Sequence, residues 1–342
     1  MSERQEHIFH WMAVVVVLLY TTLWIGAIDE IRHARDTPVP VAGGNHTEPV
    51  APPASPTENI TGAFFGPQPA KARELTDAML SFLEPLRGES GDLQYVPALP
   101  GERVAKSGDF VAPSEPGIYP LAPEIEDISI VTLVPITRKR DGRIGPYLLG
   151  SWPFESGGRP KSARYAAPRG FIEVTPQNQD FHVSDHFRLR QFLTKDQVSV
   201  WPKYLPLDPL LIDKLELTIQ ELRRQGVRVE HVHVMSGFRT PRYNARGGNT
   251  AGRANLSRHM YGDGADVYVD NNRDGQPDDI TGDGRVTTRD AEKFAQAAER
   301  VEAEHRSLVG GIGVYPACCG HGPFTHVDVR GFRARWRGSG SG

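Results

Sequence analysis

The sequence predicts an α+β protein in which two folded regions follow a membrane anchor and a tether. Three observations support this prediction. Residues 210–225 have the apolar spacing of an amphipathic helix, residues 227–235 largely alternate like a half-buried strand, and residues 11–28 form an uncharged, mostly apolar run. The chain has 342 residues, enough for about two domains, and its 39% hydrophobic and 24% charged residues exclude wholesale disorder.

Residues 11–28 are long enough to cross a bilayer core of roughly 30 Å as a helix. The alternative is a cleaved signal peptide, but the run is longer than a signal core and no clear cleavage site follows it. We therefore expect residues 1–35 to contain a single transmembrane anchor, whose orientation the flanking charges do not decide. Residues 36–72 are rich in proline, which predicts an extended linker.

Charge and cysteine content exclude several classes of protein. A formal net charge of −3 offers no basic excess for phosphates, so nucleic acid is not an expected partner. The two cysteines, Cys318 and Cys319, are adjacent, which excludes a disulfide scaffold and a Cys-based structural zinc site. Because a disulfide between neighbours is strained, we expect free thiols or an intermolecular bond.

Residues 73–172 are predicted to form a β-rich module of unknown role. Residues 74–84 have one apolar face and are expected to form a helix that Pro85 ends. Three strand-like stretches follow, separated by turn sequences: residues 109–112, 128–133 and 147–149.

The pattern changes in the second region, residues 173–338. The helix predicted over 210–225 ends at Gly226, and the alternating strand 227–235 follows directly. His231 and His233 share one face of that strand, where they could bind a metal. We interpret them as a solvated or hydrogen-bonded face and leave them out of the predicted site.

Three segments after residue 235 carry the residue types of a metal site. Glycines bend the loop between His259 and Asp266, so both side chains can face one point. His326 lies on a short alternating stretch and shares a face with Asp328. Two histidines and one carboxylate with an open fourth position are a catalytic zinc arrangement. The segments are 236–241 (SGFRTP), 257–266 (SRHMYGDGAD) and 324–328 (FTHVD).

These segments, in this order, resemble the motifs of M15-type zinc metallopeptidases. This group contains D-Ala-D-Ala carboxypeptidases and murein endopeptidases and is related to hedgehog-type domains. The resemblance covers roughly residues 181–336 and implies a small antiparallel sheet with flanking helices. Residues 339–342 are expected to be a flexible tail.

The resemblance also implies roles for individual residues. It implies that His259, Asp266 and His326 bind zinc. It further implies that Arg239 contacts the substrate carboxylate or the polarised carbonyl, and that Ser257 lines the site.

Zinc hydrolysis needs a group that accepts a proton from the attacking water. Many relatives carry an acidic residue three positions before the last zinc histidine, where this chain has Pro323. We expect Asp328 to be this catalytic base, with His321 as the second candidate. The alternative is that Asp328 orients a ligand histidine.

An acidic insertion at residues 270–290 is similar to calcium loops of the EF-hand or dockerin type, and a helix is expected over 290–304. The second loop of the insertion, residues 279–290, supplies a nearly complete set of calcium ligands. The first loop has Thr281 at its last ligand position, where a carboxylate is usual. The predicted calcium ligands are Asp279, Thr281, Asp283, Arg285 and Asp290 in the second loop and, less completely, Asp270, Asn272, Asp274 and Asp278 in the first.

Together these features predict a zinc peptidase, anchored in a bacterial inner membrane, whose catalytic domain lies in the periplasm. Its expected substrates are the stem peptides or cross-links of peptidoglycan, cut as a D,D-carboxypeptidase or an endopeptidase, with calcium in a structural role. The alternative is a catalytically silent, metal-stabilised module that binds peptidoglycan or a protein.

Overall fold

The computed structural model describes residues 84–338, apart from 105–109, 123–124, 161, 249 and 251–252. The expected anchor, the linker, the tail and residues 74–83 of the first expected helix lie outside the described residues. Among the helices of the described part, none is long and apolar enough to span a bilayer.

The fold is mixed, with several small sheets and few helices, and its largest sheet has five strands in the order β13-β11-β12-β10-β9. Neighbouring strands are antiparallel except β11 and β13, which are parallel. The expectation of a purely antiparallel sheet is therefore corrected at this edge. The bounds are β9 Val232–Ser236, β10 Gly264–Val269, β11 Gly311–Tyr315, β12 Phe324–Asp328 and β13 Ala334–Arg337.

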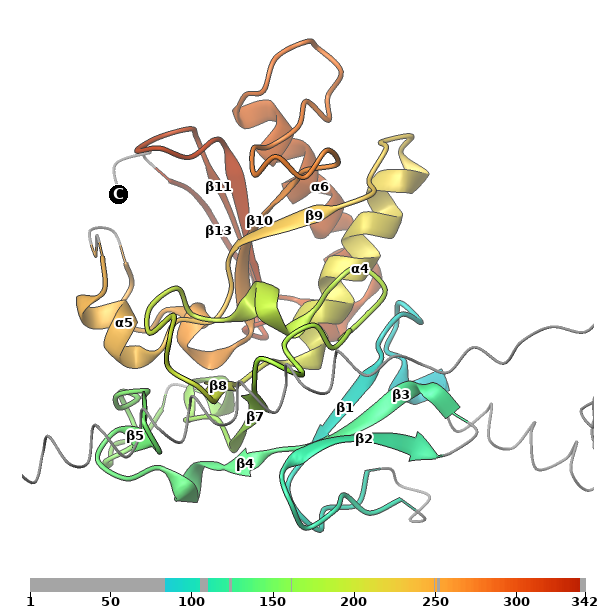
Figure 1. Cartoon of the computed structure of the whole chain (residues 1–342). Helices are drawn as coiled ribbons and strands as arrows, with labels where there is room; N and C mark the ends of the chain where they lie inside the picture. Colours follow the sequence, from blue (N-terminus) through green and yellow to red (C-terminus); the bar gives the residue numbers. More distant parts are fainter. Residues whose placement is uncertain are drawn as a thin grey trace, which may run out of the picture. The chain divides into compact units, whose positions relative to one another are not determined.

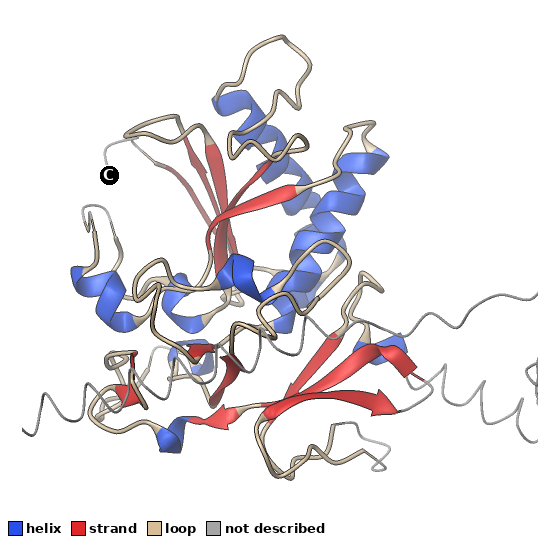
Figure 2. Cartoon of the chain, viewed as in Figure 1, coloured by secondary structure: helices blue, strands red, loops and turns tan. Residues whose placement is uncertain are grey.

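Two long helices, α4 (Pro209–Arg224) and α6 (Thr288–Glu304), pack against each other, and α6 packs against β11 and β12 (Figures 1 and 2). The Asp208 carboxylate accepts a hydrogen bond from the Leu210 amide and caps α4. Thr287 and Asp290 form a capping box at the start of α6. Both predicted helices are confirmed to within two residues. A short helix, α5 (Pro241–Arg246), follows the main-sheet strand β9.

Eight strands precede α4 in the described part of the chain. Strands are found within 128–133 and 147–149, as predicted, whereas the described residues of 109–112 make only an isolated bridge between Val111 and Arg103. The strands form sheets in the orders β1-β3-β2, β4-β7-β8 and β5-β6. Their bounds are β1 Tyr95–Ala98, β2 Gly117–Ala122, β3 Ile125–Thr132, β4 Val134–Pro135, β5 Arg143–Ile144, β6 Tyr147–Leu148, β7 Gly170–Val174 and β8 Lys203–Leu205.

The hydrophobic core continues across residue 172. Strand β7 itself spans this position, and Tyr147 and Phe171 belong to the same buried cluster as Leu215 and Val327. Buried Asp213 of α4 also accepts hydrogen bonds from the amides of residues 89 and 90, at 2.9 and 2.8 Å. Described residues on the two sides of the expected boundary therefore contribute to one buried cluster, whereas Ala98, Ala112, Leu121, Ile128 and Ile130 form a second cluster on the N-terminal side.

Candidate metal centre

Three elements bring the predicted triad together. His259 lies on a 3₁₀ helix, η5 (Arg258–Tyr261), whereas Asp266 and His326 are directly paired residues of β10 and β12. Gly262 ends η5 with a φ of 72°, and a Cβ atom there would lie 1.5 Å from the Pro206 carbonyl oxygen. Only glycine fits this turn, which returns the chain from η5 to the sheet.

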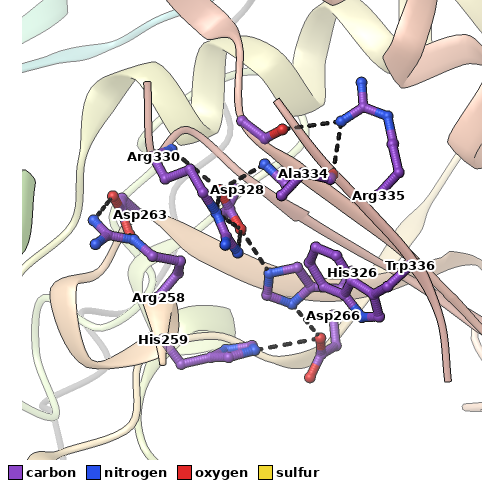
Figure 3. A network of polar contacts seen from close by, with 12 residues as sticks. Arg258, His259, Asp263, Asp266, His326, Asp328, Arg330, Ala334, Arg335 and Trp336 are labelled. Atoms are coloured by element: carbon purple, nitrogen blue, oxygen red, sulfur yellow. Dashed lines mark hydrogen bonds and ion pairs between the residues drawn. The ribbon is translucent and has the colours of Figure 1, made fainter. Parts of the chain in front are cut away.

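The triad is buried, and its donor atoms are spaced as a metal ion requires (Figure 3). The Oδ1 atom of Asp266 lies 2.8 Å from Nδ1 of His326 and 3.3 Å from Nε2 of His259. Ligand atoms around a tetrahedral zinc ion, each roughly 2.0 Å from the metal, are separated by about 3.3 Å. The three side chains could therefore hold a metal ion, since one ligand atom from each lies within 4.8 Å of the others.

The outer nitrogens of both histidines have partners that suit a metal site. The Nδ1 atom of His259 lies 2.7 Å from the Gly237 carbonyl oxygen, and Nε2 of His326 lies 3.1 Å from Oδ2 of Asp328. Metal-binding histidines commonly donate their second N–H to a carbonyl or a carboxylate. In a neutral imidazole, a proton on the outer nitrogen leaves the inner nitrogen, which faces Asp266, able to bind a metal ion.

Arg239 holds the oxygen of Asp266 that the histidines leave free. Its Nη2 atom donates to Oδ2 of Asp266 at 2.8 Å, and its Nε atom donates to the Ser236 hydroxyl at 2.9 Å. Burial, followed by the charge of Arg239, lowers the pKa of His259 to about 4. Burial alone would raise the pKa of Asp266, but His259, His326 and Arg239 hold it well below its usual range.

Asp328 is fully buried on the far side of the His326 ring (Figure 3). Its carboxylate accepts hydrogen bonds from the Gly311 amide at 2.7 Å and from Nε of Arg330 at 2.9 Å. Burial would raise the pKa of Asp328, but the bonds from His326 and Arg330 keep it well below its usual range. This geometry does not favour the predicted base and favours the alternative, in which Asp328 orients a ligand histidine.

His321 occupies a different position from Asp328. Two clefts, of about 770 and 430 Å³, share Ser236, Arg239 and Tyr243 in their walls, and His321 lines the smaller one. Its Nδ1 atom lies 2.8 Å from the Gly322 carbonyl oxygen, and its ring makes an edge contact with Phe324. The second candidate for the base therefore faces the same cleft as Arg239.

Ser257 is buried directly before η5. Within the described part of the chain, its hydroxyl makes no hydrogen bond with the triad. The place of Ser257 beside His259 follows the predicted motif, but the structure gives its side chain no contact that would assign it a role.

The second acidic loop is closed by hydrogen bonds from its own backbone. The carboxylate of Asp279 accepts from the amides of residues 282 and 284, at 2.7 and 2.6 Å, and from the Thr281 hydroxyl at 3.1 Å. Asp290 accepts from the amides of residues 280, 281 and 287. Asp283 and Arg285 are exposed. The two ends of the predicted loop therefore meet, although calcium itself remains a prediction.

The first acidic loop is folded in a similar way. Asp270 accepts hydrogen bonds from the amides of Asp274 and Gly275, and Asp278 accepts one from the amide of Asn271. The side-chain amide of Asn272 donates to Asp274 at 2.9 Å. Calcium remains a prediction in this loop also.

Several contacts of the site were not predicted from the sequence. Arg330 binds Asp328, and the ring of Trp336 lies 5.2 Å from that of His326. The alternation of residues 326, 328 and 330 along the sequence could have indicated Arg330, although β12 itself ends at Asp328. Cys318 and Cys319 form a disulfide, which corrects the expected free thiols. The turn around them is closed by backbone hydrogen bonds between Cys318 and His321.

Comparison with models of known protein families found no match, and comparisons with curated proteins and with solved structures found none either. The assignment of a function to this site therefore depends on the motifs and the geometry described above.

Proposed function

We propose that this chain is a zinc peptidase that hydrolyses stem peptides or cross-links of bacterial peptidoglycan. The observation that carries the proposal is the buried triad of His259, Asp266 and His326. The atoms of these side chains that point away from the shared centre contact the Gly237 carbonyl, Arg239 and Asp328. An open cleft lined by Arg239 lies beside the triad. Such support around the ligands is typical of metal centres. The order of the motifs supports the choice of zinc and of this substrate class.

Zinc would be held by Oδ1 of Asp266, Nε2 of His259 and Nδ1 of His326. When bound, zinc polarises a carbonyl group and lowers the pKa of water. Arg239 uses Nη2 and Nε to hold Asp266 and Ser236, whereas its Nη1 atom makes no hydrogen bond among the described residues. This remaining nitrogen is available to a substrate carboxylate or carbonyl in the cleft.

The proton acceptor is assigned to His321 rather than to Asp328. A general base must reach the water from which it takes a proton, and His321 lines a cleft that Arg239 also lines. Asp328 instead keeps the His326 ring in place through its contact with Nε2. In this mechanism Asp328 is a positioning residue and His321 is the base.

A second candidate function is a silent binding module. Pro323 occupies the position of the usual acidic residue, and the nearby carboxylate of Asp328 is fully buried and already bound. These observations favour a metal-stabilised module that grips peptidoglycan without cutting it. In both cases the N-terminal anchor and linker would hold the folded part in the periplasm.

The test is a digestion assay with the full-length chain in detergent. Purified muropeptides are incubated with the zinc-loaded protein, and the products are identified by mass. Loss of terminal alanine indicates a carboxypeptidase, and conversion of cross-linked dimers to monomers indicates an endopeptidase. The His326→Ala variant is the control and should lose both the zinc ion of the triad and cleavage. Binding to insoluble peptidoglycan without cleavage of any muropeptide would favour the silent module.

A further inference from the structure

His231 and His233 lie at an edge of the main sheet, away from the triad. They belong to β9 and the residue just before it, and β9 is an outermost strand of this sheet. Because side chains alternate along a strand, the two histidines face the same side. Both are half-buried and line the larger cleft, which also contains Ser236 and Arg239.

Asp270 brings a fixed carboxylate to these histidines. It directly follows β10, is only 1% exposed, and its backbone amide donates to the His231 carbonyl oxygen at 3.0 Å. The amides of Asp274 and Gly275 donate to its two carboxylate oxygens at 3.0 and 3.1 Å. The carboxylate is therefore held in place by the backbone rather than by the histidines.

The rings of His231 and His233 keep ring nitrogens that make no hydrogen bond with described residues. The ring of His233 stacks on Tyr268, with centroids 4.9 Å apart and an interplanar angle of 11°. Its Nδ1 atom lies 3.7 Å from Oδ2 of Asp270, which is too far for a hydrogen bond. The ring nitrogens of His231 make no hydrogen bond with any other described residue. One ligand atom from each of the three residues lies within 4.8 Å of the others.

We propose that His231, His233 and Asp270 form a second metal site that takes a divalent transition ion such as Zn²⁺. Two imidazoles and a carboxylate suit zinc, nickel or copper, whereas calcium and magnesium prefer oxygen ligands. Three protein ligands beside an open cleft leave room for water or for an anionic group of a bound molecule.

The second site is separate from the triad. Ser236 pairs with Asp266, and His233 pairs with Tyr268, so the sites are about three residues apart along β9, or roughly 10 Å. Two metals that act on one bond lie about 3.5–4 Å apart. The second ion therefore does not complete a binuclear centre, and the proposal stands whether or not the chain is a peptidase.

Five basic residues, Lys195 and Arg273 among them, line the same cleft as the histidines and outnumber its three acidic residues. Their charges oppose a cation, so the second ion should bind less tightly than the ion in the triad and should leave first during dialysis. The same charges, together with the ion, would attract an anionic group into the cleft.

The test measures zinc stoichiometry in the full-length, untagged chain. The protein is stripped with a chelator, saturated with Zn²⁺ and separated from free ion before metal analysis. We expect about two zinc ions per chain, and about one in His231→Gln and in His233→Gln, because each variant removes one of three ligands. His182→Gln, which changes another histidine of the same cleft, is the matched control and should keep both ions.

A crystal of the zinc-loaded protein provides a second measurement. Anomalous scattering at the zinc edge should give a peak between His231, His233 and Asp270, separate from any peak at the triad. One zinc per chain in the unmutated protein with no peak at this position, or two ions retained in both glutamine variants, would overturn the proposal. Calcium bound at Asp270 independently of both histidines would also overturn it and assign Asp270 to the first acidic loop.

Discussion

Asp328 contacts Nε2 of His326 at 3.1 Å, on the edge of the ring opposite to the one that faces Asp266. The carboxylate is in turn held by Arg330 and by the Gly311 amide. This contact favours a proton on Nε2, and in a neutral ring Nδ1 would then have a lone pair for a metal ion. Asp328 would therefore influence an ion in the triad through its contact with His326.

The first prediction concerns Asp328→Asn. The amide preserves size but weakens the contact that orients His326, so zinc affinity should fall roughly 10–100-fold. Competition with a chromophoric chelator measures this change. Asp180→Asn, at an exposed position in the larger cleft, is the control and should leave zinc affinity unchanged. Unaltered zinc affinity with lost muropeptide cleavage would restore Asp328 as the base.

The second prediction concerns Arg239→Lys. Lysine keeps the positive charge but cannot reproduce the paired contacts of the guanidinium with Asp266 and Ser236. Cleavage should fall on the order of 10²–10³-fold, as for the loss of one donor to a developing charge, while zinc content stays near one at the triad. Muropeptide digestion and metal analysis check the two parts. The matched control is Arg242→Lys at a neighbouring exposed position, and an equal loss there would argue against a specific role of Arg239.

The third prediction concerns calcium. An ion that binds only the folded state at 100 times its Kd adds about 2.7 kcal/mol of stability. Calcium should therefore raise the Tm of the unmutated chain, and the rise should be smaller in Asp279→Ala, which removes the first ligand of the second loop. Calorimetry with calcium and with chelator measures it. Asp141→Asn, in an exposed turn elsewhere, should keep the rise. A Tm indifferent to calcium in the unmutated chain would remove this site.

The fourth prediction concerns Lys214, a buried lysine that links α4 to β12, the strand that carries His326. Lys214 donates to Glu302 at 2.6 Å and to the Asp328 carbonyl oxygen at 2.8 Å. Lys214→Met leaves the Glu302 carboxylate without this partner, which should cost about 3–5 kcal/mol of unfolding free energy. Denaturant titration measures the loss. The control Lys293→Met, a partly exposed lysine of α6, should change stability far less.

The fifth prediction concerns pH and His186. Its Nδ1 atom lies 2.6 Å from the buried Glu216 carboxylate, and this hydrogen bond raises the pKa of His186 although burial and the charge of Arg223 oppose it. The raised pKa means that the added stability is fully present below the ordinary pKa of 6.5 and is lost as pH rises through the folded-state value. The stability difference between the unmutated chain and Glu216→Gln should shrink over that rise. NMR titration of His186 checks the shift itself, and an equal titration midpoint in both proteins would contradict it.

Periodicity predicted the helices well because the apolar positions of α4 and α6 are buried, although α4 also buries polar residues such as Asp213, Lys214 and Glu216. It placed the start of the following strand too early. Residues 227–231 look like a strand by alternation, but Arg223 donates to the Val229 carbonyl oxygen at 2.9 Å and Asn271 accepts from the Glu230 amide at 2.7 Å. These side-chain contacts replace ladder partners, so the strand begins at Val232.

The triad was predictable because its three residues lie in two short motifs, 257–266 and 324–328. Its supporting contacts were less so, since they join distant segments. Lys214 reaches Asp328 from a helix more than a hundred residues earlier, and Asp270 meets His231 across neighbouring strands. Hydrophobic spacing carries no information about such pairings. For the same reason, the sequence did not indicate that residues on both sides of residue 172 pack into one buried cluster.

The direct pairing of Asp266 with His326 links the metal centre to the correctness of the sheet. A slip of one residue between β10 and β12 would turn His326 to the opposite face and leave Asp266 facing another side chain. Only the native register of β10 and β12 brings Asp266 and His326 together. An ion that binds there therefore lowers the free energy of the native register and not that of a shifted one. Metal binding at the triad would in this way stabilise the native register of β10 and β12 relative to shifted registers.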